Sequence, residues 1–183
     1  MRVRGQALAP TTAMSRDRGF ATALVYGAIA GVNGAACMSV LRLAARRMGL
    51  IDKMPPQVVQ DWLARQLGAD PKDDVLHHVA DHAVHLTIGA AGGAVYGALT
   101  SSRRPTYSSG VLHGLAVWAI GFFALIPRLG IARSAAHAEP RENLVNIAAH
   151  AVYGAILALF VGEMRAQGRR PASRPERYMT RVG

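Results

Sequence analysis

Four long stretches of this chain contain no aspartate, glutamate, lysine or arginine. They cover residues 19–41, 82–102, 105–127 and 143–162, and every charged residue lies between or outside them. A helix needs roughly 20 mainly apolar residues to cross a bilayer core of about 30 Å. A surface helix of a soluble protein, in contrast, carries polar or charged residues along one face. The missing charge therefore predicts four transmembrane helices and disfavours a soluble bundle.

Cysteine, aromatic and acidic residues are also scarce. Cys37 is the one cysteine, so no intrachain disulfide can form. Aromatic residues make up 6% of the chain, and 21 Lys and Arg against 11 Asp and Glu give a net charge of +10. The basic residues flank the uncharged stretches without an aromatic platform. We therefore attribute them to contact with anionic lipid headgroups and expect no nucleic-acid binding.

Signatures of catalysis are missing as well. The chain has no Gly-Lys-Ser phosphate loop, no serine elbow and no cysteine pair. Ser39 and Cys37 have no evident base near them in the sequence. We therefore expect that the protein is not an enzyme.

The remaining pattern predicts an all-α fold: a four-helix transmembrane bundle. Residues 1–18 form a basic tail, residues 19–162 hold the four spans, and residues 163–183 form a second basic tail that we expect to be flexible. The helix of the first span is expected to continue past its uncharged part and to stop at Gly49.

The long loop after the first span predicts a short amphipathic helix. Pro55-Pro56 suits a helix start, and Gly68 suits its end. Between them, apolar residues that include Trp62 recur at helical spacing, with polar residues opposite. Such a helix fits an interfacial position between spans 1 and 2, or a place on the ends of the bundle. Asp70-Pro71 then predicts the start of the helix that contains span 2.

The distribution of charge predicts an orientation. With four spans, the N-terminus, the second loop and the C-terminus share one side, and they carry most of the net positive charge. Lysine and arginine concentrate on the cytoplasmic side of membrane proteins. We therefore expect both termini to be cytoplasmic.

Glycines recur at four-residue spacing in the first two spans. Span 1 carries Gly27 and Gly31, and span 2 carries Gly89, Gly93 and Gly97. Because lipid supplies no hydrophobic drive for helix pairing, small residues that let two backbones approach closely matter most. The spacing predicts that spans 1 and 2 pack on each other, or that one of them serves a homodimer.

Several of these motifs together resemble a known family. The glycine-rich segment from Gly27 to Met38 is followed by Met54-Pro55-Pro56 and the amphipathic loop helix, and span 4 carries His150-Ala151-Val152-Tyr153-Gly154. In this the chain resembles the YagU-like bacterial inner-membrane proteins, over residues 20–165. The resemblance implies a multi-span inner-membrane protein with a link to acid tolerance. It brings no catalytic residue.

Polar residues inside the spans are the candidate functional residues, because polar groups are costly in a bilayer. Asn33, His85, Asn146 and His150 are predicted to converge in the outer half of the bundle, from their depths along the spans. Three interpretations stay open. The residues form interhelical hydrogen bonds, or they line a proton or ion path, or His85 and His150 hold a metal or haem.

A second histidine pair lies just outside span 2. His78 and His82 are four residues apart, which places two ligands for a divalent metal on one helical face. The alternative is that both are solvated residues at a membrane interface.

The sequence therefore predicts a small inner-membrane protein of structural or regulatory role, linked to envelope stress or acid tolerance. The alternatives are a proton or ion conductor and a metal- or haem-binding subunit of a larger membrane complex. We expect no cofactor in the first case. The expected partners are the lipid bilayer and either further copies of the chain or other membrane subunits.

Overall fold

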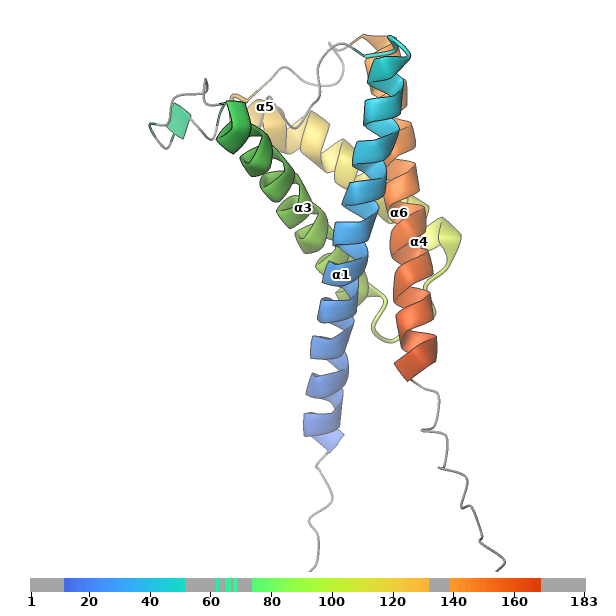
Figure 1. Ribbon diagram of the computed structural model, residues 1–183. Coiled ribbons are helices and arrows are strands. Elements are labelled where there is room, and N and C mark those ends of the chain that lie inside the picture. Colours follow the sequence, from blue (N-terminus) through green and yellow to red (C-terminus); the bar gives the residue numbers. More distant parts are fainter. Residues whose placement is uncertain are drawn as a thin grey trace, which may run out of the picture.

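Helices make up the whole described secondary structure. The computed structural model describes residues 12–51, 62, 65, 66, 68, 74–131 and 139–168. Its helices are α1 (Thr12–Arg47), α3 (Asp74–Leu99), α4 (Tyr107–Ala119), the π-helix η1 (Ile120–Leu125), α5 (Ile126–Arg128) and α6 (Pro140–Gly168). α4, η1 and α5 follow one another without a break (Figure 1). The predicted all-α fold is thus confirmed for these residues.

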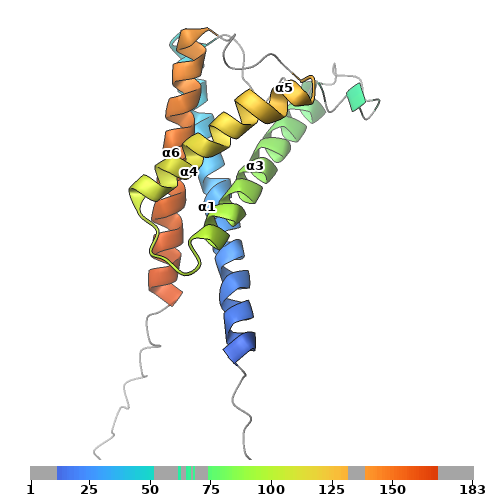
Figure 2. The same cartoon turned by 180° about the vertical axis from the view of Figure 1, so that it is seen from behind.

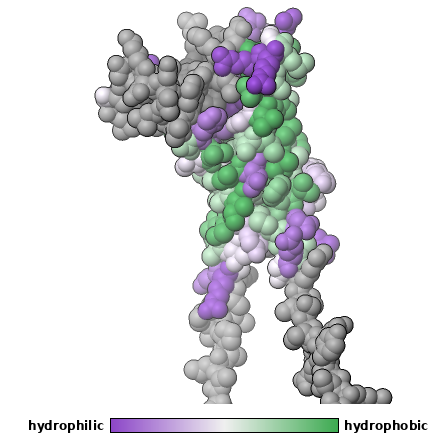
Figure 3. All heavy atoms as spheres, viewed as in Figure 1, coloured by the Kyte–Doolittle hydropathy of each residue, from purple (hydrophilic) through white to green (hydrophobic). Residues whose placement is uncertain are grey.

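Three of the described helical segments are long and apolar enough to cross a membrane. They are Asp17–Arg47, Tyr107–Arg128 and Pro140–Gly168. α3 is not among them. Figure 3 shows a largely apolar band of surface with polar residues at its two ends. These features support a membrane protein and a helical bundle.

The end of α1 lies where the sequence predicts it. Gly49 has φ +69°, a left-handed conformation that glycine adopts without steric cost. The Gly49 amide donates to the carbonyl of Arg46 at 3.0 Å, and the Leu50 amide donates to Ala45 at 2.9 Å. These bonds pair carbonyls that the last turn of the helix would otherwise leave free.

The third predicted span changes its helical register near its end. In η1 the backbone follows π geometry, and the Ile126 amide donates to Gly121, five residues earlier. Pro127 follows directly, and a proline ring clashes with the carbonyl four residues before it in a regular α-helix. Widening the preceding turn relieves that clash, which gives the π-helix a physical cause.

A row of glycines joins α1 to α3. A Cβ atom added at Gly27 would overlap the carbonyl oxygen of Gly93, and one added at Gly31 would overlap that of Gly89. At Gly97 the overlap would be with the carbonyl of Ala23. The two backbones are therefore in direct contact. This agrees with the expectation that spans 1 and 2 pack on each other.

A second glycine crossing joins α4 to α6. A Cβ atom added at Gly110 would overlap the carbonyl of Gly154, and one added at Gly114 would overlap the carbonyl of His150. Contact between these two helices was not predicted from the sequence. Gly110 and Gly114 show the same four-residue spacing as the glycines of α1 and α3.

The two crossings are linked through α1 and α6, which run side by side (Figures 1 and 2). Large side chains of α6 fill the space between these helices, with Tyr153, Leu157 and Val161 at most 2% exposed. The helices thus touch in the order α3, α1, α6, α4. α3 meets α4 only sparsely, so the fourth side of the bundle is not closed by helix packing.

The ends of the membrane domain are more helical than the sequence predicts. α1 begins at Thr12, within the predicted N-terminal tail, and α6 continues to Gly168, within the predicted C-terminal tail. Arg165 is consequently held by the fold. Its guanidinium donates to the carbonyls of Gly97 (3.0 Å), Thr100 (2.6 Å) and Arg103 (3.2 Å). Arg165 therefore fastens the C-terminal end of α3 to α6.

Most of the predicted loop helix lies outside the described residues. Trp62, Arg65 and Gln66 are helical, and Gly68 has φ +68°, which suits the predicted helix end. The predicted helix start at Asp70-Pro71 also lies outside the described residues. α3 is described from Asp74 onward.

Candidate functional site: an apolar cavity beside Arg42

A cavity of about 310 Å³ lies on the side of the bundle that helix packing leaves open. α1, α3, the α4–η1–α5 rod and α6 all contribute to its wall, together with Trp62. The wall is mainly apolar. Its large apolar side chains include Met38, Ile88, Val117, Phe122, Leu125 and Leu129.

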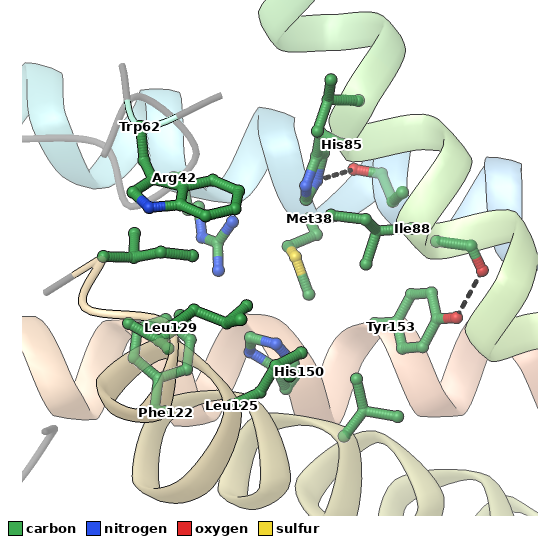
Figure 4. A pocket seen from close by; sticks show the side chains of 17 residues that line it. Met38, Arg42, Trp62, His85, Ile88, Phe122, Leu125, Leu129, His150 and Tyr153 are labelled. Atoms are coloured by element: carbon green, nitrogen blue, oxygen red, sulfur yellow. Dashed lines mark hydrogen bonds between the residues drawn. The ribbon is translucent and has the colours of Figure 1, made fainter. Parts of the chain in front are cut away.

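The cavity opens to the surroundings along one rim. Ile88 on α3 is 53% exposed, and Leu125 in η1 is 55% exposed, although both line the cavity. Figure 4 shows Ile88 beside α3 and Leu125 beside η1, on different sides of the cavity. The rim is therefore open to the surroundings of the helix bundle.

The end of the cavity farther from the C-terminus of α1 is closed by a tyrosine. Tyr153 on α6 is 2% exposed, and its hydroxyl donates to the carbonyl of Gly89 on α3 at 2.7 Å. The Tyr153 ring also packs against Gly34 of α1, where a Cβ atom would lie 2.7 Å from the ring. The bond fastens α3 to α6 below the cavity.

Arg42 is the charged residue in the cavity wall. Its side chain is 2% exposed, and Nη2 donates to Oδ1 of Asn146 at 3.2 Å. Nε is buried and has no hydrogen-bond partner among the described residues. Figure 4 shows the guanidinium beside Trp62 at the end of the cavity opposite Tyr153. A buried, incompletely paired guanidinium is unusual, since burial of charge is costly without compensation.

His85 and His150 lie on the cavity wall, as the sequence analysis expects of residues that converge. Nε2 of His85 lies 3.3 Å from the carbonyl of Ala35, across the contact between α3 and α1. Nδ1 of His150 lies 2.8 Å from the carbonyl of Asn146 on its own helix. A carbonyl oxygen only accepts, so in both rings the nitrogen named here is the donor. Each neutral ring then keeps a lone pair on its other nitrogen.

The four predicted polar residues are not all brought together. Asn146 joins His150 and Arg42 through its carbonyl and its side chain. Asn33 does not line the cavity, and its Nδ2 donates to the carbonyl of Ile29 on its own helix at 2.9 Å. The amide of Asn33 is thus satisfied locally.

The candidate metal pair His78 and His82 receives no further ligand from the described part of the chain. His82 is exposed, and the side chain of His78 lies outside the described residues. No group of three or more potential metal-binding side chains occurs among the residues that the structure describes.

Arg42 was not predicted as a site residue, because it was assigned to the basic residues that flank span 1. A signal was present in the spacing. Ala35, Met38, Arg42 and Ala45 recur every three or four residues, and all four are buried. Arg46 and Arg47 lie off this stripe and are exposed.

No protein family, curated protein or solved structure matches the chain in comparisons of its sequence and fold.

Proposed function

We propose that the chain is a four-span integral membrane protein of regulatory or structural role, and that its cavity binds an apolar ligand taken from the bilayer. The spans would be α1, α3, the α4–η1–α5 rod and α6. The observation that carries the proposal is the cavity itself, which is mainly apolar and opens between α3 and the rod. Pockets of roughly 300–1,000 Å³ are typical of small-molecule sites.

An even number of spans is supported by the arrangement of the helices. The start of α1 and the end of α6 lie at the same end of the structure (Figure 1). This is what two cytoplasmic termini require. Location in a bacterial inner membrane and membership of the YagU-like family belong to the same proposal and rest on the sequence motifs.

Gly121 offers a direct test, because it lines the cavity and a Cβ atom added there meets no neighbour within 4 Å. Gly121→Phe should fill the cavity without disturbing the backbone. Gly19→Phe is the matched control, since Gly19 is equally unobstructed and lies outside the cavity. We expect dodecan-1-ol, an uncharged single-chain probe, to bind the wild type and the control in native mass spectrometry. Binding to Gly121→Phe should be at least ~10-fold weaker, the loss of roughly 1.4 kcal/mol.

Two results would contradict the binding function. One is a wild-type protein that takes up no dodecan-1-ol. The other is a Gly121→Phe variant that binds the probe as well as the Gly19→Phe control does.

A proton path is the second candidate, because His85 and His150 both lie on the wall of this cavity. Histidine titrates near neutral pH and can carry protons. The test is acidification of liposomes that contain the protein, followed with a pH-sensitive dye inside them. Conduction that His85→Ala and His150→Ala each abolish would favour this function over ligand binding.

A further inference from the structure

The polar atoms in the cavity wall differ in whether they have a hydrogen-bond partner. The hydroxyl of Tyr153 and one ring nitrogen each of His85 and His150 contact backbone carbonyls. Arg42, in contrast, keeps a buried Nε that has no acceptor among residues 12–51, 62, 65, 66, 68, 74–131 and 139–168. Besides the free lone pairs of the two imidazoles, this wall thus holds a buried donor, Nε of Arg42, that lacks an acceptor and belongs to a charged group.

The partner that would supply this acceptor is an anion. Arginine stays charged at any physiological pH and presents five donors in a planar fork that matches carboxylate and phosphate oxygens. Nη2 is engaged with the neutral side chain of Asn146, which does not compensate the charge. Among the described residues no carboxylate pairs with Arg42, and an anionic ligand would compensate its charge.

The rest of the cavity requires an apolar ligand body. Beyond Arg42 the cavity runs past Met38 and Ile88 to Tyr153 (Figure 4). From Arg42 back to Ala35 the wall of α1 covers about 10 Å, at about 1.5 Å of rise per residue. The volume of about 310 Å³ lies at the small end of ligand pockets, which favours one alkyl chain.

The depth of Arg42 fits the headgroup of such a molecule. Arg42 lies five residues, about 7.5 Å, before the end of α1 at Arg47. Arg46 and Arg47 are exposed at that end, where a membrane surface would lie. Tyr153 closes the cavity deeper in the helix bundle. An amphiphile in the cavity would thus keep its headgroup near the membrane surface and its chain toward the bilayer centre.

We propose that the cavity binds a single-chain amphiphile with an acidic headgroup, and that Arg42 holds the headgroup while the apolar wall holds the chain. This inference rests on the proposed binding function and names its ligand class. The headgroup chemistry is an oxyanion that accepts from Nε of Arg42. A fatty-acid carboxylate and an alkyl phosphate both supply it.

The experiment compares three probes of equal chain length on the purified full-length protein in a neutral detergent. Dodecanoate, dodecyl phosphate and dodecan-1-ol are titrated in native mass spectrometry at pH 8. Hydrogen bonds to charged groups are strong enough that we expect at least one anion to bind roughly 10-fold or more tightly than the alcohol. The ratio between dodecanoate and dodecyl phosphate distinguishes the two headgroups.

Arg42→Met tests the role of the guanidinium, because methionine keeps an unbranched apolar stem of similar reach. In this variant the preference for the anion over dodecan-1-ol should disappear. Arg42→Lys keeps the charge and loses the fork, so its preference should be intermediate. Arg46→Met is the matched control, since Arg46 is exposed on the same helix and does not line the cavity.

The other outcomes would overturn either the acidic headgroup alone or the binding function as well. Equal binding of anion and alcohol to the wild type, or an anion preference that survives Arg42→Met, overturns the acidic headgroup and leaves the apolar ligand in place. Absence of binding of all three probes overturns both proposals. Thermal unfolding of Arg42→Met in the same detergent reports whether the variant is folded.

Discussion

The glycine crossings and the cavity show two opposite ways of packing helices within one small bundle. At the α1–α3 and α4–α6 crossings the backbones touch, and not even a methyl group fits between them. On the remaining side α3 and α4 meet mainly through the side chains of Tyr96, Ser109 and His113, and a cavity of about 310 Å³ lies between α3 and the rod. Close backbone contact makes the two helix pairs rigid, which allows the gap between them to persist without collapsing.

Arg42, which is buried, and Arg165, which is only partly buried, repeat this contrast. Arg165 donates to three backbone carbonyls at and just after the end of α3, so it stabilises the contact between α3 and α6. Arg42 donates to the side-chain oxygen of one amide, and its Nε has no acceptor within the part of the chain that the structure describes. The arginine on the packed side thus has several hydrogen-bond acceptors, whereas Arg42 on the open side has one among the described residues.

The largest expected effect is at a glycine crossing. Gly93→Ala would place a methyl group against the Gly27 carbonyl and the Gly31 backbone, so α1 and α3 must separate. We expect a loss of about 1–3 kcal/mol and a fall in Tm of roughly 5–10 °C in detergent. The matched control is Gly121→Ala on the cavity wall, where the methyl group meets no neighbour. Equal Tm values for the two variants would remove the distinction between packed and open sides.

The second largest effect is a difference in stability between variants of the two arginines. Arg165→Met leaves carbonyls of Gly97, Thr100 and Arg103 without their charged donor, which should cost about 1–3 kcal/mol. Arg42→Met removes a buried charge that is poorly compensated, so its effect on stability should be neutral or stabilising. Thermal unfolding of both variants in the same detergent measures the difference. A larger loss of Tm for Arg42→Met than for Arg165→Met would contradict it.

The smallest effect concerns two asparagines that the sequence treats alike. Asn33→Ala removes a hydrogen bond within one helix turn and should change stability by less than about 0.5 kcal/mol. Asn146→Ala takes the acceptor from Nη2 of Arg42 and should cost about 1–2 kcal/mol. Denaturation curves of the two variants provide the test. A costly Asn33→Ala beside a neutral Asn146→Ala would place Asn33 in the functional cluster after all.

Local chemistry made much of the helical structure predictable. The charge-free stretches correspond to the described helices, and Gly49 ends α1 by adopting a conformation that glycine favours. The glycine spacing in α1 and α3 indicated their contact, because small residues at four-residue spacing form one helical face. The π-helix escaped prediction, although Pro127 supplies its cause.

The candidate site was predictable only in part. His85 and His150 were placed near each other from their depths along the spans, and both line the cavity. Asn33 has a matching depth and points elsewhere, because depth along a helix does not fix rotation about its axis. Arg42 was assigned to the solvated flank of α1, since its neighbours Arg46 and Arg47 belong there.

The sequence by itself determined where the helices run and which of their faces carry small residues. These properties depend on residues close together in the chain, whose spacing is fixed by the helix repeat. Only the tertiary structure decided that the bundle stays open between α3 and α4 and that Arg42 faces that opening. Both depend on the angles at which distant helices cross, and those angles follow from the shapes of the packed surfaces of several helices together.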